Sequence, residues 1–147
     1  MRTSVSARSN LLKSAVSFHG HLGPYLILGL RMGLAAKRTL RPRGPKDLSA
    51  TVWTKRHPPE SCTLDGIQIS SGCTLGKGNL QIRNASRVRA RFRKGNRSLV
   101  MTPTKKAARL LHSIARPEFQ DRLRELAFSL NRIPDDDLFV VKPSMCA

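Results

Sequence analysis

The 147-residue sequence predicts an α+β fold, in which helices pack against a small antiparallel sheet. Three observations predict it: apolar residues at helical spacing from Tyr25 to Leu40, strict alternation within residues 86–101, and helix-starting residues after position 101. A chain of this length fits one ordinary domain and buries a core without disulfides. We therefore expect a single domain over residues 1–147, with C-terminal helices over roughly 103–130.

Two helices are expected in the N-terminal part of the chain. The apolar-rich segment 11–18 predicts the first, and Pro24 suits the first turn of the second, which runs from Tyr25 to Leu40. Gly29 and Gly33 stand four residues apart in this second helix. Each glycine weakens a helix, so we expect that they allow close packing against another element.

The middle of the sequence alternates between expected strands and one helix. Leu48 to Thr54 alternates and predicts a strand, with Val52 on one face and Trp53 on the other. Ser61 is expected to cap a helix that continues to Ser70. A short strand is expected at 80–83, after a glycine-rich loop.

Residues 86–101 show the clearest local pattern and predict a β-hairpin. The apolar residues Val88, Ala90 and Phe92 alternate with Arg87, Arg89, Arg91 and Arg93. On a strand, all four guanidinium groups would lie on one face, about 6.6 Å apart. Two interpretations stay open for this strand: contact with a phosphate backbone, which would offset the repulsion between like charges, or a solvated edge strand that resists aggregation.

The C-terminal part predicts two further helices and a short strand. Thr102 and Pro103 are expected to be the N-cap and first residue of a helix over 105–115, and Pro117 to open a second helix that ends at Leu130. The tail from Leu138 is expected to add a strand. The inward-facing residues are expected to be Ala108, Leu111 and Ile114 in the first helix, and Phe119, Leu123, Leu126 and Leu130 in the second.

The charge is strongly basic and unevenly distributed. The sequence has 27 Lys and Arg against 9 Asp and Glu, which gives a net charge of +18. Residues 1–46 and 66–117 contain no acidic residue at all. Such a field repels itself and favours a polyanionic partner, for which nucleic acid is the first candidate. The alternative is a surface selected for solubility.

The first functional hypothesis is therefore a protein that binds RNA, with ribosomal RNA and association with the ribosome as the specific form of the prediction. Aromatic residues make up only 5% of the chain, so recognition is expected through the backbone and shape of the RNA rather than base stacking. The residues expected to contact phosphates are Arg87, Arg89, Arg91, Arg93, Lys94, Arg97, Arg38, Arg41 and Arg43.

Composition also bears on the compartment. No apolar run is long enough to form a transmembrane helix, and the N-terminus lacks the apolar region of a signal peptide. The three cysteines form no tight cluster, which disfavours a secreted disulfide framework. We expect a cytoplasmic protein with reduced thiols and no membrane partner.

Two segments are dense in side chains that carry chemistry. His19 and His21 are two residues apart in a glycine-containing loop, where both imidazoles could reach one metal ion. Cys62, Asp65 and Cys73 lie in the second segment. A set of histidine and cysteine ligands suits zinc, but by spacing alone a satisfied histidine pair and two buried cysteines explain the residues equally well. Asp65, a lone acid among cations, is expected to be paired or to serve as a ligand.

A phosphate-binding loop is excluded for the glycine-rich stretch after Cys73. Gly76-Lys77-Gly78 invites that interpretation, but only three residues separate Gly72 from Gly76, and Gly78 stands where Ser or Thr is required. These glycines are expected to permit a tight turn.

Together the two segments resemble the FmdE family, which takes its name from formylmethanofuran dehydrogenase. The first motif is Phe18-His19-Gly20-His21-Leu22 with Pro24, Gly29 and Arg31-Met32-Gly33. The second is Ser61-Cys62, Asp65-Gly66-Ile67-Gln68 and the continuous run from Gly72 to Leu80. The similarity spans roughly residues 9–101, and the second motif is long and specific.

The resemblance implies an α+β domain, commonly a homodimer, with a metal-binding pocket where the two motifs meet, and zinc as the metal. The implied metal ligands are His19, His21, Cys62 and Cys73, and the implied pocket residues are Asp65, Lys77 and Asn79. Two departures matter. Many members have Cys where this chain has Gly23, and many carry a C-terminal cysteine-rich zinc module, whereas the last third here contains only Cys146. The alternative hypothesis is thus a zinc-binding enzyme or accessory protein of one-carbon or redox metabolism.

Overall fold

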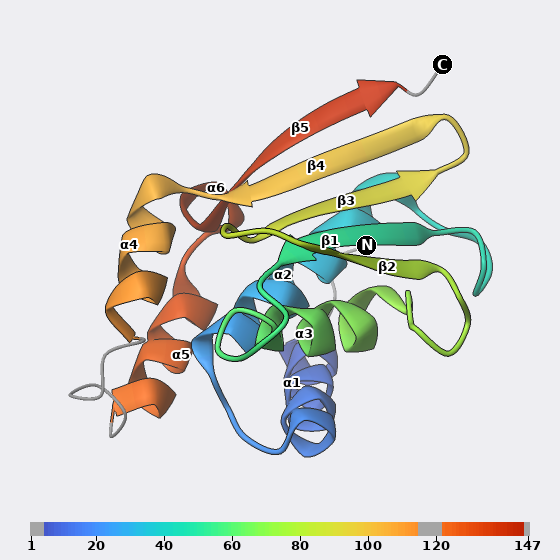
Figure 1. Ribbon diagram of the computed structural model, residues 1–147. Coiled ribbons are helices and arrows are strands. Elements are labelled where there is room, and N and C mark those ends of the chain that lie inside the picture. The colour runs from blue at the N-terminus through green and yellow to red at the C-terminus, as the bar shows by residue number, and fades with distance from the viewer. Residues whose placement is uncertain (1–4, 115–121, 146–147) are drawn as a thin grey trace.

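The protein, as a computed structural model, is described over residues 5–114 and 122–145. Figure 1 shows the chain as a sheet with helices gathered on one side of it. The helices are α1 (Val5–His19), α2 (Pro24–Leu40), α3 (Cys62–Ser71), α4 (Lys105–Ile114), α5 (Leu123–Arg132) and α6 (Asp135–Leu138). The strands are β1 (Ser49–Thr54), β2 (Leu80–Asn84), β3 (Arg89–Lys94), β4 (Arg97–Pro103) and β5 (Phe139–Met145).

The described strands form one sheet in the order β2-β1-β3-β4-β5, which confirms the α+β prediction. Three of its four pairings are antiparallel, including the predicted β3–β4 hairpin. The fourth, β1 with β2, is parallel. The reason is that α3 lies between these two strands in the chain and returns it to the same end of the sheet, as parallel pairing requires.

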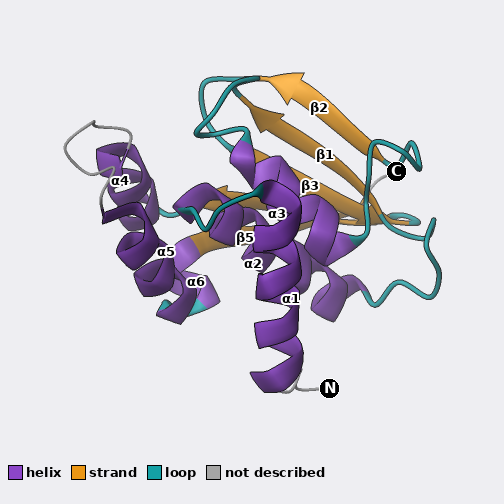
Figure 2. Ribbon diagram, turned by 90° about the horizontal axis from the view of Figure 1, so that it is seen from below, coloured by secondary structure: helices purple, strands orange, loops and turns teal. Residues whose placement is uncertain are grey.

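One face of the sheet carries the core, and none of the described helices lies over the other. Figure 2, a view from below, shows the helices in front of the strands. Ala90, Phe92 and Met101 point toward the helices and are fully buried. The alternate residues Arg89 and Arg93 are exposed on the opposite face. The alternation predicted for β3 is therefore confirmed, although Arg87 precedes the strand.

Helices α2 and α3 meet through glycines, as the spacing of Gly29 and Gly33 predicted. A Cβ atom at Gly29 would overlap the Thr63 carbonyl oxygen of α3. On the facing helix, a Cβ atom at Gly66 would overlap the Leu26 carbonyl oxygen and lie 2.5 Å from the Leu30 nitrogen. The two backbones are thus in direct contact, and this contact places the start of α3 beside the end of α1.

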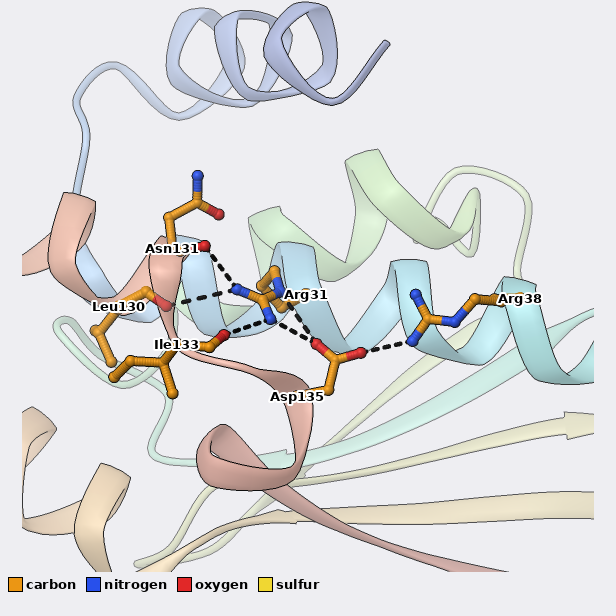
Figure 3. Close-up of polar contacts among 6 residues, drawn as sticks. All are labelled: Arg31, Arg38, Leu130, Asn131, Ile133 and Asp135. Atoms are coloured by element: carbon orange, nitrogen blue, oxygen red, sulfur yellow. Dashed lines mark hydrogen bonds and ion pairs between the residues drawn. The ribbon is translucent and has the colours of Figure 1, made fainter. Parts of the chain in front are cut away.

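The C-terminal segment is attached to α2 by one arginine (Figure 3). The Arg31 guanidinium donates hydrogen bonds to the backbone oxygens of Asn131 and Ile133 at 2.9 and 2.7 Å. It also pairs with the Asp135 carboxylate at 2.7 Å, and Arg38 reaches the other oxygen of the same carboxylate at 2.5 Å. Because these groups lie about 100 residues apart in sequence, Arg31 closes the fold over a long separation.

The predicted start of α4 is wrong by two residues. Thr102 and Pro103 are the last residues of β4, and the cap is Thr104, whose hydroxyl oxygen accepts a hydrogen bond from the Ala107 amide at 3.1 Å. Consequently Ala107 is buried and Ala108 is exposed, the reverse of the expectation. The competing factor is pairing with β5, which extends β4 to Pro103.

Other expected elements are confirmed or fall outside the description. The tail forms β5 as predicted, and Leu130 of α5 is fully buried. The expected helix start at Pro117 and the inward residue Phe119 lie outside the described residues, as does the side chain of Ile114. Among the described helices, none is both long and apolar enough to cross a membrane.

Candidate functional site

The two sequence motifs meet at a hydrogen bond between His19 and Asp65. His19 is the last residue of α1 and Asp65 lies in the first turn of α3. The His19 Nδ1 atom lies 2.6 Å from the Asp65 carboxylate. An ionised carboxylate only accepts hydrogen bonds, so Nδ1 carries the proton and donates it. Asp65 is therefore paired, as its isolation among cations predicted.

The second ring nitrogen of His19 has no partner among the described residues. Its Nε2 atom is buried and makes no hydrogen bond with them. Buried polar atoms are nearly always satisfied, and an exception marks a position where a ligand, an ion or a substrate is expected. With Nδ1 fixed by Asp65, Nε2 is the nitrogen available to coordinate a metal or move a proton.

A pocket of about 270 Å³ adjoins this pair. Its walls come from the end of α1, the loop before α3, the first turns of α3, the following loop and the inner face of β2. The lining residues are His19, Pro58, Ser61, Cys62, Leu64, Asp65, Gln68, Leu75, Leu80 and Ile82. Most of the lining is apolar with a few polar groups at one end, which is the usual composition of a small-ligand site.

Cys62 is the thiol of this pocket. Its side chain is partly buried, and burial raises the pKa of the Cys62 thiol, with the Asp65 carboxylate raising it further. The thiol is therefore protonated at neutral pH. It becomes a strong ligand or nucleophile only when a metal ion or a base removes its proton.

His21 lies beside His19 at the edge of the site. The centroids of the two imidazole rings are 4.6 Å apart. Gly23 is close to the same ring: a Cβ atom at this position would lie 3.3 Å from the His21 Nε2 atom. The cysteine that many family members carry at this position would thus stand next to His21, and its absence removes one potential ligand.

The other implied ligand, Cys73, lies apart from this pocket. It is fully buried in the core, and its Sγ atom is 3.5 Å from the Leu48 carbonyl oxygen. Burial raises the pKa of the Cys73 thiol as well. No three His, Cys, Asp or Glu side chains within residues 5–114 and 122–145 are gathered closely enough to hold a metal ion as they stand. His19, His21 and Cys62 fit zinc in donor type and location, but completing the site requires movement.

Lys77 and Asn79 fix a loop rather than line the pocket. The Lys77 Nζ atom donates to the Pro45 carbonyl oxygen at 2.8 Å. The Asn79 side chain donates to the Leu48 carbonyl oxygen at 2.9 Å and accepts from the Thr74 amide at 2.9 Å. The Gly72–Asn79 loop is thereby held against the segment before β1.

The predicted nucleic-acid residues do not form one continuous stripe. The outer face of β3 carries Arg89, Arg91 and Arg93, and Arg97 is exposed at the hairpin. The others lie elsewhere: Arg87 lines a hollow beside α4, Arg38 pairs with Asp135, and Lys94 binds Asp47 at 3.5 Å and the Arg41 carbonyl oxygen at 2.7 Å. Arg41 and Arg43 flank that Lys94 contact in the segment after α2.

Sequence reasoning missed the position of Trp53 within this basic face. In the sheet register, Trp53 of β1 lies between Arg83 of β2 and Arg89 of β3. The Arg89 guanidinium carbon is 4.2 Å from the centroid of a Trp53 ring, and that of Arg91 is 5.6 Å away. The alternation in β1 predicted the face of Trp53, but only the strand order places arginines on both sides of it.

Comparisons with known proteins agree with the two motifs. The family model described as "FmdE, Molybdenum formylmethanofuran dehydrogenase operon" matches residues 18–140. A curated protein of Archaeoglobus fulgidus, named a probable S-adenosyl-L-methionine-binding protein, is 35% identical over 81 residues. The match covers 51% of this chain but only 21% of the relative, so the chain spans about a fifth of that protein's length.

A solved structure shares the fold. The FmdE-like protein of the tungsten formylmethanofuran dehydrogenase from Syntrophus aciditrophicus superposes with a TM-score of 0.60 at 15% sequence identity. The alignment covers 95% of this chain and 72% of the other. Since the family model spans most of the sequence, including the His19 and Asp65 motifs, this chain belongs to the FmdE family.

Proposed function

We propose that this chain is a metal-binding accessory domain of one-carbon or redox metabolism, related to formylmethanofuran dehydrogenase, with His19 as its first metal ligand. The observation that supports this proposal is the His19–Asp65 pair, in which the carboxylate holds Nδ1 while Nε2 is buried without a partner among the described residues. Histidines that bind metals commonly donate their second N–H to a carboxylate in this way. Imidazole and thiolate donors together suit zinc.

His19, His21 and Cys62 are the proposed ligands, and Cys73 is a fourth candidate that would have to leave its core contact. Bound zinc would act as a Lewis acid and would lower the pKa of the Cys62 thiol. Asp65 would fix the orientation of the His19 ring. The apolar residues Leu64 and Leu75 line the same pocket and would limit the access of water.

The Asp65→Asn variant is expected to bind zinc about 10- to 100-fold more weakly, because the neutral amide no longer supports the basicity of His19. Zinc affinity is measured by competition with a chromophoric chelator at fixed pH. His19→Ala should abolish tight binding. His112→Ala, which removes an exposed imidazole on α4, is the matched control and should change nothing.

Cobalt(II) substitution identifies the thiol ligands. We expect a thiolate-to-cobalt charge-transfer band that disappears in Cys62→Ser, and Gly23→Cys should strengthen zinc binding, since its Cβ atom lies beside His21. If the wild-type protein binds no more than trace zinc and cobalt, or if Asp65→Asn binds as tightly as wild type, the proposal is wrong.

A second candidate function, RNA binding, is favoured by the open face of the sheet. Arg83, Arg89, Arg91 and Arg93 project from this face, which none of the described helices covers (Figure 2). None of the four forms an ion pair with a carboxylate of the described residues. Four uncompensated guanidiniums on one surface would release counter-ions on meeting a phosphate backbone.

Replacement of Arg89, Arg91 and Arg93 by Gln should weaken RNA binding and make it less sensitive to salt. Each phosphate contact on a single strand contributes about 0.7 to the slope of log affinity against log salt, so we expect that slope to fall by about 2. Fluorescence anisotropy of a labelled RNA over a salt series measures it. The control variant Lys13→Gln, Arg124→Gln, Arg132→Gln removes the same charge from α1 and α5. Equal slopes in the two variants would contradict an interface on this face.

A further inference from the structure

We propose that the open face of the sheet binds single-stranded RNA by stacking an unpaired base on the Trp53–Arg89 pair. The inference rests on the RNA-binding function proposed above and specifies the form of RNA and the contact. It departs from the expectation of recognition through backbone and shape alone, since the sheet register places the one tryptophan of the sequence among the arginines.

The geometry of the face supports a stacking contact. Arg83, Trp53 and Arg89 occupy one row across β2, β1 and β3, at the strand spacing of about 4.8 Å. The Arg89 guanidinium already lies over the Trp53 ring, with its carbon 4.2 Å from the centroid. A base that joins this pair meets a flat aromatic or guanidinium surface, and cations on either side are placed to hold its phosphates.

A hollow beside Trp53 provides room and polar groups for the base. The hollow has a volume of about 680 Å³ and is lined by Trp53, Arg56, Gln81, Ile82, Arg83 and Asn84. The side chains of Gln81 and Asn84 carry both donors and acceptors, which match the edge of an unpaired base. The Arg56 guanidinium reaches over the β2 edge toward the Ile82 carbonyl oxygen at 3.5 Å, so a cation stands at this rim too.

Single strands are favoured over duplexes by what the face presents. In a duplex the bases are stacked on each other, and only the phosphates and groove edges would be in reach of Arg83 and Arg89. An unpaired base has both faces free, and an aromatic ring beside a row of cations is the usual arrangement in proteins that bind single strands. The partly exposed ring of Trp53 then gains a partner instead of water.

The test uses the intrinsic fluorescence of Trp53, which reports on this site alone because the sequence has one tryptophan. Three probes of one sequence are titrated at low salt into the wild-type protein: single-stranded RNA, the corresponding RNA duplex and single-stranded DNA. We expect single-stranded RNA to quench the emission and to bind at least 10-fold more tightly than the duplex. Trp53→Leu should bind it about 10-fold more weakly, as loss of one stacked base predicts, whereas Trp53→Phe should retain most of the affinity.

Phe128→Leu is the matched control, because Phe128 is an exposed aromatic residue on α5 with the Arg124 guanidinium 5.9 Å from its ring. It should leave RNA affinity unchanged, and thermal unfolding of each variant verifies the fold. RNA binding without quenching, equal affinity for duplex and single strand, or tighter binding of DNA would overturn the stacking proposal while the RNA-binding function stands. Absence of any RNA binding at low salt would overturn both.

Discussion

Gly66→Ala is expected to lower the free energy of unfolding by about 3 kcal/mol, although alanine normally stabilises a helix relative to glycine. The added methyl group would lie 2.5 Å from the Leu30 backbone nitrogen and 2.9 Å from the Gly29 carbonyl carbon, and it would overlap the Leu26 oxygen. Backbone atoms cannot rotate away as a side chain does, so α2 and α3 must separate. Urea unfolding followed by circular dichroism measures the change.

Gly76→Ala is the control for this prediction. Nothing lies within 4 Å of a Cβ atom at Gly76, so its effect should stay within about 0.5 kcal/mol. Because Asp65 precedes Gly66 on α3, separation of the helices should also weaken the His19–Asp65 hydrogen bond. A Gly66→Ala protein as stable as wild type would show that the two helix backbones are not in contact.

Arg31→Met is expected to destabilise the protein by about 3 kcal/mol at neutral pH. The change keeps the length of the side chain but leaves the Asn131 and Ile133 carbonyl oxygens and the Asp135 carboxylate without their shared donor. Arg38→Met provides the control. Its side chain is 52% exposed, and an exposed pair contributes less than about 1 kcal/mol.

The same pair makes stability depend on acid pH. Burial alone would raise the pKa of Asp135, but the hydrogen bonds and charges of Arg31 and Arg38 outweigh it and hold the pKa below the ordinary value of 3.8. A depressed pKa means that the stabilisation is complete above the unfolded-state value and is lost as pH falls through the folded-state value. Unfolding free energies measured from about pH 6 down to about pH 2 should therefore fall less steeply in Arg31→Met than in wild type. Parallel pH profiles would contradict this assignment.

Local structure was predictable wherever neighbouring residues determine it. Pro24 and the apolar spacing after it place α2, and the alternation of Ala90 and Phe92 with arginines places β3, because both patterns report directly on a buried face. The start of α4 was not predictable in this way. Thr102-Pro103 is a good helix start by itself, but pairing with β5, from the far end of the chain, keeps it in β4.

The site was predictable in part, since the resemblance brought both motifs together and the isolation of Asp65 predicted a partner. The identity of that partner was not predictable, because His19 is 46 residues away and the α2–α3 glycine contact sets their distance. The burial of Cys73 against the Leu48 carbonyl oxygen and the row of Arg83, Trp53 and Arg89 also depend on strand order. Strand order depends on contacts across the whole chain, which spacing does not report.

The segment that closes the fold has a consequence for how the nascent chain reaches its native state. Leu130 and Leu138 are fully buried and Phe139 is 1% exposed, and all three follow every other core element in order of synthesis. Until they emerge, the growing polypeptide displays the apolar surfaces they will later cover, together with an arginine on α2 that still lacks its acceptors. Completion of the core is thus a late event of translation, and the unfinished chain is the form in which this protein is most prone to aggregate.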